Sequence, residues 1–552
     1  MSDANDKPAA ARSRTALARL RYGGIHLQED RDARRGPGPR RWRCMLRLKL
    51  PCGRLDAERY LGLIEVAAWF TPTGDLRLTG GRNVELHGID PADVPAAIAA
   101  LRRAGLALGC DASGLEYNVS GPVPRAGNAR LQVAAGLAER LCDKLYPTPD
   151  SSLPARVAAC LDDPDAAADL PAHPPRKFTV GVALPEDNSG DLLGQDLGLL
   201  LDRDHDGIWY ASVYAGGGMS LYRGYADSFA TPAMLLGRVP LSAAEATVDA
   251  AVALVRDAVD PTDARRCRLK YLLAERGGTW VRRRLREYVD LGVAGDGPRP
   301  ALKSPDLRGI SRGDDGRHSL CVAVPGGRLA AANPGRGIAE AVTALRPDLA
   351  LTPDQNLLLT GLDAPALGRA RRLLARHGAA PPDPAAEPVH AVTCTGPPHC
   401  RRALCESQRA LAGLTAELER VLAETGRAGA ALDLRLAACP IGCVRPYSAE
   451  IGVVGVRRGR YDVFLGGDAG QGRLGDLYVS RIRPEDIVPA LRPLLLDWAR
   501  RGGANEGFGA YYRRRFHRRP RARRLTGEFP APAVSRVLAD ILETTDTGDA
   551  PN

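Results

Sequence analysis

The chain has 552 residues, of which 44% are hydrophobic, an ordinary share for a globular protein with several domains. Its net charge is +11, and arginine supplies most of the positive excess. No apolar run approaches the ~18 residues of a membrane span, and the polar start of the chain is not typical of a signal peptide. Because 12 cysteines occur without an export signal, we expect a cytoplasmic protein with no membrane partner.

Both ends of the chain are rich in arginine. Residues 1–41 also contain much Ala, Gly and Pro and predict a disordered basic tail, and residues 501–552 predict a C-terminal tail. Basic tails can bind nucleic acid, but the first basic cluster has no interleaved aromatic residue and no nucleic-acid-binding signature follows. We therefore expect solvated tails and no nucleic-acid partner. A basic surface would also attract an acidic electron donor.

The first folded segment is predicted at 42–108. A strand is expected over 44–51, a helix over 57–70, a strand over 76–79 and a second helix over 91–104. The same order recurs about 274 residues later, since 320–329 matches 46–55 and 349–356 matches 76–83. A repeat with such constant spacing indicates an internal duplication.

Two close pairs of cysteines stand on either side of one predicted helix. Cys394 and Cys400 have five residues between them, and Cys439 and Cys443 have three. Leucines from 404 to 422 recur at intervals of three, four and seven, which predicts the helix. A short strand over 432–437 is expected to lead into the second pair, so both pairs would lie in loops at the ends of elements.

Four thiolates on two loops can enclose one metal centre. Zinc sites space a pair by about two to four residues, so the wider first pair favours a broader iron–sulfur cluster. The alternative is that the four cysteines are structural, because free cysteine packs as a small hydrophobe. A fifth cysteine, Cys405, falls inside the predicted helix, and we interpret it as a packing residue.

The cysteine pattern and the segments 449–455 and 459–467 resemble the sulfite and nitrite reductases that carry a sirohaem coupled to a [4Fe–4S] cluster. The resemblance covers about residues 42–510. It implies that the cluster is held by four ligands, of which Cys443 also bridges to the sirohaem iron. These ligands are Cys394, Cys400, Cys439 and Cys443.

The resemblance also implies an α+β fold class. It predicts duplicated ferredoxin-like half-domains at 42–108 and 317–380, related by a pseudo-twofold axis. Each half-domain would be followed by a larger sirohaem/iron–sulfur α+β domain, at 109–285 and 381–500. A Gly- and Pro-rich linker is expected over 286–316.

The implied reaction is the six-electron reduction of nitrite to ammonia or of sulfite to sulfide. Such a site needs cationic groups around the oxygens of the anion, to stabilise charge and supply protons. Two of the family's four substrate cations match Arg47 and Lys177, which we predict to be catalytic. The other two positions hold the neutral residues Tyr117 and Thr179. The missing charge favours nitrite slightly, because nitrite carries less charge than sulfite.

Sirohaem carries several carboxylates and needs a basic and polar cradle. At one position the family's arginine would fall on Gly81, whereas this chain has Arg82. Because strand side chains alternate between faces, we expect Arg82 to point away from the cofactor. The resemblance implies cofactor-binding roles for Arg77, Thr79, Arg176, Lys270, Gln355 and Asn356.

The segment 470–475 matches a dinucleotide fingerprint, but the strand-like residues that follow it indicate a hairpin loop. We therefore expect electrons from another protein, a ferredoxin or a flavoprotein. Two alternatives remain open. The first is a precorrin-3B synthase-like oxygenase, which shares this ancestry. The second is a non-catalytic iron–sulfur electron-transfer subunit.

Overall fold

The computed structural model describes most of the chain between residues 20 and 526. The predicted tails lie largely outside the described residues. Among the residues that are described, no helix is both long and apolar enough to cross a membrane. The described residues are 20–29, 31–32, 42–108, 115–123, 128–146, 155, 158–159, 176–222, 225, 227–260, 263, 266–292, 300–379, 381, 389–427, 431–516 and 525–526.

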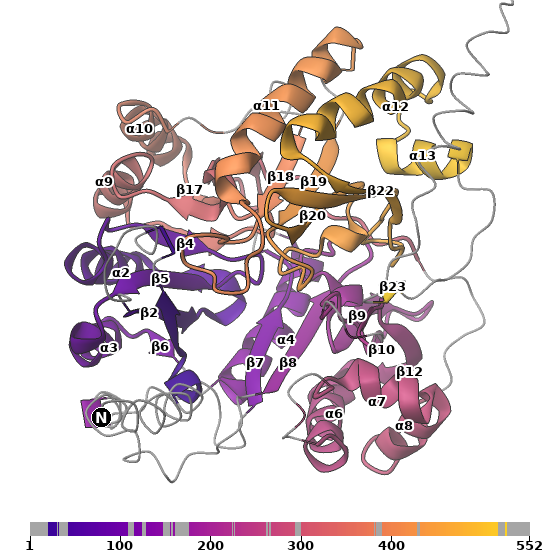
Figure 1. Cartoon of the computed structure of the whole chain (residues 1–552). Coiled ribbons are helices and arrows are strands. Elements are labelled where there is room, and N and C mark those ends of the chain that lie inside the picture. The colour runs from indigo at the N-terminus through magenta and orange to yellow at the C-terminus, as the bar shows by residue number, and fades with distance from the viewer. Residues whose placement is uncertain are drawn as a thin grey trace, which may run out of the picture. The chain divides into compact units, whose positions relative to one another are not determined.

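The chain divides into two compact units (Figure 1). Unit 1 contains Met1–Gly217 and Ala233–Pro381, and unit 2 contains Gly218–Pro232 and Pro382–Asn552. Both predicted half-domains and the domain between them therefore belong to unit 1. Each unit is described by itself.

Unit 1 contains two copies of one supersecondary arrangement, as the repeat in the sequence predicts. In each copy a strand, a one-turn 3-10 helix, a short strand and a helix are followed by a hairpin and a second helix. The first copy contains β2 (Trp42–Lys49), η3 (Pro51–Gly53), β3 (Arg54–Leu55), α2 (Ala57–Phe70), β4 (Leu76–Leu78), β5 (Val84–Ile89) and α3 (Val94–Arg103). The second contains β14 (His318–Val322), η8 (Pro325–Gly327), β15 (Arg328–Leu329), α9 (Gly335–Leu345), β16 (Asp348–Leu351), β17 (Leu357–Leu362) and α10 (Ala364–Ala375).

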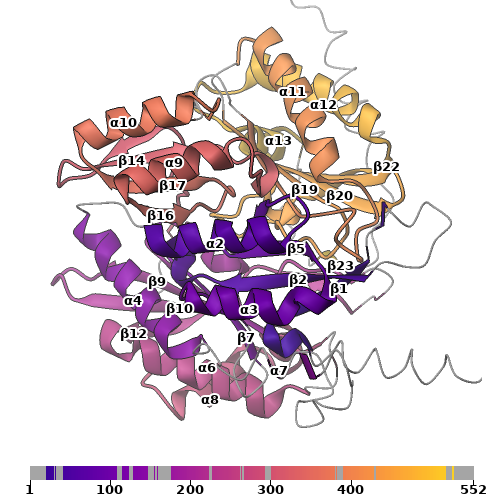
Figure 2. The ribbon, with the colours of Figure 1, turned by 90° about the vertical axis from the view of Figure 1, so that its left-hand side faces the viewer.

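The two copies exchange a short strand. β15 of the second copy pairs with β4, and β3 of the first copy pairs with β16. With β1 (Ile25–Glu29) and β13 (Ile310–Arg312) at their edges, the sheets thus run β1-β2-β5-β4-β15 and β13-β14-β17-β16-β3. Figure 2 shows α2 and α3 side by side over the first sheet. This reciprocal pairing confirms the duplicated α+β fold.

The hairpin turns of the two copies use the same hydrogen bonds. The backbone N–H of Asn83 donates to Thr79 Oγ1 at 3.0 Å, and Asn83 Oδ1 accepts from the N–H of Leu50 at 2.9 Å. These bonds tie the β4–β5 turn to the end of β2. The second copy repeats both bonds, at 3.0 and 2.9 Å, with Thr352, Asn356 and Val324.

A third sheet completes unit 1. Its order is β12-β10-β9-β8-β7, with parallel pairing from β7 to β9 and antiparallel pairing beyond. The strands are β7 (Leu115–Ser120), β8 (Arg176–Ala183), β9 (Leu197–Arg203), β10 (Trp209–Ala215) and β12 (Met234–Pro240). The helices are α4 (Ala129–Leu145), α6 (Ala244–Ala258), α7 (Leu269–Arg276) and α8 (Gly278–Arg286).

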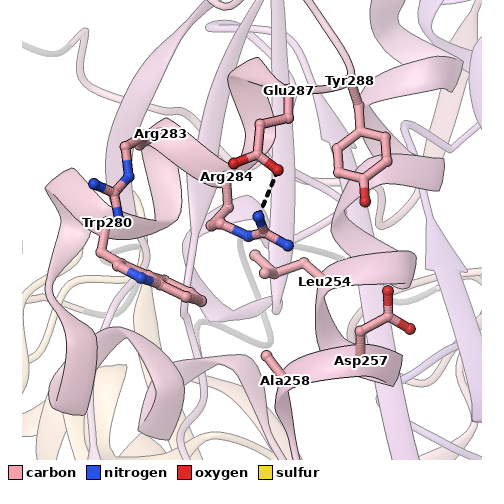
Figure 3. Close-up of a pocket in the computed structure, with 8 residues that line it drawn as sticks. All are labelled: Leu254, Asp257, Ala258, Trp280, Arg283, Arg284, Glu287 and Tyr288. Atoms are coloured by element: carbon pink, nitrogen blue, oxygen red, sulfur yellow. Dashed lines mark hydrogen bonds and ion pairs between the residues drawn. The ribbon is translucent and has the colours of Figure 1, made fainter.

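A pocket of about 300 Å³ opens between α6 and α8 (Figure 3). Its walls include the rings of Trp280 and Tyr288 and the ion pair between Arg284 and Glu287. The residues that line it include no predicted site residue.

Unit 2 is built on one sheet in the order β18-β19-β20-β21-β22. The predicted strand over 432–437 is confirmed as β19, and the helix after the first cysteine pair is α11. The elements are β11 (Phe229–Ala230), β18 (Val389–Thr393), α11 (Gln408–Glu424), β19 (Leu432–Ala437), β20 (Ile451–Arg457), β21 (Arg460–Leu465), β22 (Asp476–Ile482), α12 (Ile487–Arg501), α13 (Phe508–Phe516) and β23 (Leu525–Thr526).

Three sequence predictions need correction. The predicted N-terminal tail contains β1 (Ile25–Glu29), which pairs with β2 and buries Ile25. The predicted linker contains β13 (Ile310–Arg312), which pairs with β14, and the predicted C-terminal tail contains α13. β1 and β13 are short edge strands, whose pairing depends on the neighbouring strand rather than on their own composition.

Candidate functional site

Side chains from four strands of unit 1 form a cluster of charges. Arg47 and Lys49 lie on β2, Glu85 on β5, Glu116 on β7 and Lys177 on β8, and we call these five residues the charge cluster. The register places Arg47 opposite Glu85 and Glu116 opposite Lys177. Since residues two apart on a strand share a face, Arg47 and Lys49 point the same way. The structure thus brings together the two predicted catalytic residues.

Arg47 is held by two carboxylates. Its Nε donates to Glu85 Oε1 at 2.9 Å, and its Nη1 donates to Glu116 Oε1 at 3.3 Å. Its Nη2 lies 2.9 Å from the same Glu85 oxygen, and its side chain keeps 28% exposure. The guanidinium is therefore oriented by carboxylates while part of it remains open to solvent.

Lys49 joins the cluster through Glu116. Its Nζ donates to Glu116 Oε1 at 3.0 Å and to the carbonyl oxygen of Tyr117 at 2.9 Å. The lysine side chain is buried. Neither Lys49 nor the two carboxylates was predicted from the sequence, although the alternation of Arg47 and Lys49 on one strand was a visible signal.

Both carboxylates are ionised. Burial acts to raise the pKa of Glu85, but Arg47 and His87 outweigh it and hold that pKa well below its usual range. Burial acts in the same way on Glu116, and Lys49 and Arg47 lower its pKa well below the ordinary value. The charge cluster therefore contains three cations and two anions.

Lys177 is the cation of the charge cluster that changes its protonation state close to neutral pH. Desolvation lowers its pKa to about 8 against the attraction of Glu116, and repulsion from Arg47 adds to the shift. Water still reaches the side chain. The ammonium is therefore charged at neutral pH and loses its proton in mildly alkaline solution.

If the chain catalyses the anion reduction that the resemblance implies, its rate should fall as the pH rises through about 8. Lys177 is protonated below its pKa, and only the charged form attracts an anion. Nitrite keeps its charge over this range, so kcat/KM measured against pH reports the free enzyme. Lys177→Arg should remove the fall, because arginine stays charged. An unchanged profile in that variant would show that another group titrates.

Tyr117 and Thr179 occupy the two substrate-cation positions that are neutral in this chain, and their side chains contact residues outside the charge cluster. Tyr117 is buried in the core and packs edge-on against Phe178 at 6.3 Å. The Thr179 hydroxyl donates to Asp196 Oδ2 at 2.9 Å, and Arg268 Nε donates to Asp196 Oδ1 at 2.7 Å. The neutral tyrosine therefore belongs to the hydrophobic core, and Thr179 positions a buried ion pair.

Two histidines extend the charge cluster toward β1. His87 lies 3.1 Å from Glu85 Oε2 through Nε2 and 3.0 Å from Gln28 Oε1 through Nδ1. Burial lowers the pKa of His87. Burial and Arg47 also lower the pKa of His26 to about 3, so the His26 ring is neutral at pH 7. His26 and Gln28 were missed because they lie in the segment predicted as a tail.

Arg77 and Lys270 are the candidate cofactor cations that the structure buries. Arg77 is 9% exposed, its Nη1 is buried without a hydrogen-bond partner, and burial lowers its pKa to about 10. Burial followed by repulsion from Arg268 lowers the pKa of Lys270 to about 7. A buried donor without a partner costs free energy, so Arg77 fits the carboxylate of an anionic cofactor.

The remaining residues predicted to bind the cofactor include two that lie in the hairpin turn of the second copy. Gln355 Nε2 donates to the carbonyl oxygen of Leu78 at 3.1 Å, which places Gln355 beside Thr79 at the end of β4. Asn356 uses its side-chain oxygen for the second turn. Arg176 begins β8, and its side chain lies outside what the structure describes.

Arg82 has a left-handed backbone conformation in the turn between β4 and β5. Its φ is +56°, and the equivalent Gln355 has φ +64°. Its side chain is 2% exposed, its Nη2 donates to the carbonyl oxygen of Gly121 at 2.6 Å, and its Nη1 is buried without a partner. The shift of the arginine from position 81 to position 82 thus directs its side chain into the interior of unit 1, among buried residues.

The predicted cysteine ligands lie on two loops of unit 2. Cys394 directly follows β18, and its Sγ accepts a hydrogen bond from the N–H of Ala438 at 3.2 Å. Burial raises the pKa of Cys439 to about 12, and the neighbouring thiols of Cys394 and Cys400 add to the shift. These three thiols therefore lie near one another, while Cys443 on the second loop is exposed.

Cys405 is distinct from these four. It is 3% exposed, precedes α11 rather than lying within it, and donates through Sγ to the carbonyl oxygens of Arg457 at 2.7 Å and Arg460 at 3.1 Å. Its thiol is thereby hydrogen-bonded to the β20–β21 turn. The interpretation of Cys405 as a packing residue agrees with these contacts.

The donor set suits an iron–sulfur cluster. Within the described part of the chain, no three His, Cys, Asp or Glu side chains are grouped tightly enough to hold a single metal ion. A [4Fe–4S] cluster is broader than one ion and binds four thiolates. Four cysteines without disulfide bonds on two adjacent loops, one already accepting a backbone N–H, match that requirement.

An α+β protein with duplicated half-domains, a cluster of charged side chains and four paired cysteines fits a reductase with an iron–sulfur centre. A family model described as the nitrite/sulfite reductase ferredoxin-like half domain matches residues 41–104. A second, the nitrite and sulphite reductase 4Fe-4S domain, matches residues 167–291. The latter range covers β8 to α8, in unit 1.

Relatives agree over nearly the whole chain. The NADPH sulfite reductase hemoprotein beta-component of Myxococcus xanthus is 32% identical, with 93% of this chain and 91% of that protein covered. A second such component from Klebsiella pneumoniae is 30% identical, with 89% of each chain covered. The solved structure of the Mycobacterium tuberculosis NirA protein matches with a TM-score of 0.70 and 19% identity, over 90% of this chain and 89% of that one.

The chain belongs to the nitrite and sulfite reductase family. It is therefore an oxidoreductase, and its cofactors are the sirohaem and the [4Fe–4S] cluster of that family. The expected family and the α+β fold are both confirmed.

Proposed function

We propose that this chain reduces nitrite to ammonia with six electrons from a separate donor protein. The charge cluster carries the proposal. Arg47, Lys49 and Lys177 are opposed by the ionised Glu85 and Glu116, which leaves a single net positive charge. One positive charge matches a monoanion better than it matches sulfite, which is largely a dianion near neutral pH.

The chain's own residues have defined parts in this proposal. Arg47, oriented by Glu85 and Glu116, presents the exposed part of its guanidinium to the oxygens of the anion. Lys177 supplies a second charge, and its pKa of about 8 suits a group that gives up a proton near neutral pH. Both groups stabilise negative charge without needing to reorganise.

The cofactor-binding residues follow from burial and chemistry. We assign Cys394, Cys400, Cys439 and Cys443 as ligands of the cluster, which supplies electrons one at a time. Arg77 and Lys270, with Thr79, Arg176, Gln355 and Asn356, are proposed to bind the sirohaem carboxylates. The buried unpartnered Nη1 of Arg77 supports this set most directly.

The electron donor is proposed to be a separate protein, a flavoprotein or a ferredoxin. The glycine-rich segment 470–475 lies between β21 and β22 and is followed by a strand, so it lacks the helix that a dinucleotide site needs. The relatives are named as components of NADPH sulfite reductases, which favours a partner that draws on NADPH. The net charge of +11 favours an acidic partner.

Sulfite reduction is the second candidate function, because the relatives carry that name. The two functions separate in kcat/KM for each anion, measured with a reduced viologen as donor. Nitrite should be the better substrate of the unmodified enzyme. A strong preference for sulfite would contradict the charge argument and leave the family assignment intact.

Glu116→Gln should raise the sulfite-to-nitrite ratio of kcat/KM by at least roughly tenfold, because one charge-assisted contact is worth about 1.5–3 kcal/mol. The change removes one negative charge from the cluster and keeps the shape of the side chain. Glu245→Gln, on α6 beside Arg140, is the matched control and should leave the ratio unchanged. An unchanged ratio in Glu116→Gln would show that the cluster does not select between the anions.

A further inference from the structure

Two buried cysteines of unit 1 meet outside the sites described above. Cys52 lies on η3 and Cys142 on α4, with 2% and 1% exposure. Their Sγ atoms are 3.6 Å apart. The distance is that of a thiol–thiol contact, so once one sulfur has been oxidised the other can attack it with little movement.

Cys52 stands where the fold favours glycine. Its φ is +50°, in the left-handed region that residues with a Cβ rarely adopt. The equivalent position of the second copy, in η8, is Gly326 with φ +59°. The duplicated turn therefore forms with glycine, and the backbone alone does not account for a cysteine at 52.

Arg82 adds a cation beside this pair. Its guanidinium is buried, its Nη1 has no hydrogen-bond partner, and the charge of Cys52 acts on its pKa. The hydrogen bond from Cys142 lowers the pKa of Cys52 in spite of burial, and Arg82 contributes to the same shift. The pKa of Cys142 is raised well above its ordinary value, first by Cys52 and then by burial. The Sγ–Sγ contact of 3.6 Å and the buried guanidinium beside Cys52 thus assign Cys52 as the attacking thiol and Cys142 as its resolving partner.

We propose that Cys52 and Cys142 are a modification site that hydrogen peroxide converts reversibly into a disulfide. The Cys52 thiolate attacks one peroxide oxygen, the O–O bond breaks, and the departing hydroxide takes up the thiol proton as water. Cys142 then attacks the sulfenic sulfur of Cys52, forming the S–S bond and releasing a second water. Two thiols have lost two electrons and two protons, and the peroxide has been reduced.

The disulfide would tie η3 to α4. The N–H of Leu50, just before η3, is held by Asn83, so the bond would also brace the end of β2 that carries Lys49. It would close a long loop between residues 52 and 142, which restricts the unfolded chain. The oxidised protein should therefore unfold at a higher temperature than the reduced protein.

The test uses the full-length holoprotein, reduced and then exposed to equimolar hydrogen peroxide without oxygen. Remaining thiols are alkylated under denaturing conditions, and the peptides are examined by mass spectrometry without reduction. We expect one cross-linked peptide pair containing Cys52 and Cys142, lighter by two hydrogens, which dithiothreitol separates. The proposal is overturned if both cysteines remain alkylatable or appear only as sulfinic acids.

Two variants complete the test. Cys52→Gly introduces the residue found at the equivalent position 326, so it should fold, lack the cross-link and lose the peroxide-dependent rise in unfolding temperature. Cys44→Ala removes another buried cysteine, whose pKa burial raises to about 12, and should keep both. A rise in unfolding temperature that persists in Cys52→Gly would assign the effect to other cysteines and overturn the proposal.

Discussion

Replacing Cys439 with serine should remove the iron–sulfur cluster and with it all reductase activity. Cys439 is buried beside Cys394 and Cys400, and a serine oxygen is a harder and poorer ligand than a thiolate. We expect iron and acid-labile sulfide to fall to background in the purified variant. Activity with a viologen donor should fall by at least about 10³-fold, since the route for electrons is lost.

Cys405→Ser is the matched control for this variant. Cys405 is also buried and precedes α11, but its sulfur donates to backbone carbonyl oxygens, as a serine hydroxyl can. The control should keep its iron and its absorption spectrum. If Cys439→Ser kept a full complement of iron, or if Cys405→Ser lost it, the four assigned ligands would be wrong.

Replacing Arg47 with methionine should damage both activity and stability. In the proposed function the guanidinium of Arg47 contacts the anion, and in the structure it neutralises Glu85, which is buried. Loss of an oriented charge at a reaction site costs about 10²–10³ in rate. Leaving a carboxylate buried without its partner destabilises the fold by about 2–4 kcal/mol, below the largest values because Arg47 is partly exposed.

Lys177→Met separates these two roles. Water reaches Lys177 in the unmodified protein. Because the side chain is exposed, little free energy of folding depends on its charge. Lys177→Met should therefore lose activity toward the anion at pH 7 without loss of unfolding free energy in denaturant titrations. Equal destabilisation in both variants would show that Arg47 has no special structural part.

The carboxylates of the charge cluster change the charge of the proposed anion site. Counting cations along the sequence finds Arg47 and Lys177 and two neutral positions, Tyr117 and Thr179. The fold turns Tyr117 into the core and adds Lys49 together with two carboxylates. The charge available to a substrate is thus set by residues that a comparison of cation positions does not include.

The sequence by itself determined the features that depend on spacing and periodicity. The repeat predicted the duplicated half-domains, and the predicted helix over 57–70 coincides with α2. Leucine spacing predicted most of α11, although the helix begins only at Gln408. The cysteine pairs were placed correctly at the ends of elements, because the strand over 432–437 leads directly into the second pair.

Only the tertiary structure decided which side chains meet. Glu85 and Glu116 are separated in sequence from Arg47 by a helix or more. Pairing of β2 with β5 brings Glu85 to the guanidinium, and Glu116 reaches it from a strand of another sheet. β1 has too few residues to be recognised by composition, yet pairing with β2 brings Gln28 to His87. Cys52 and Cys142 meet because η3 packs on α4. Long-range contacts of this kind depend on register and packing, which local sequence patterns do not encode.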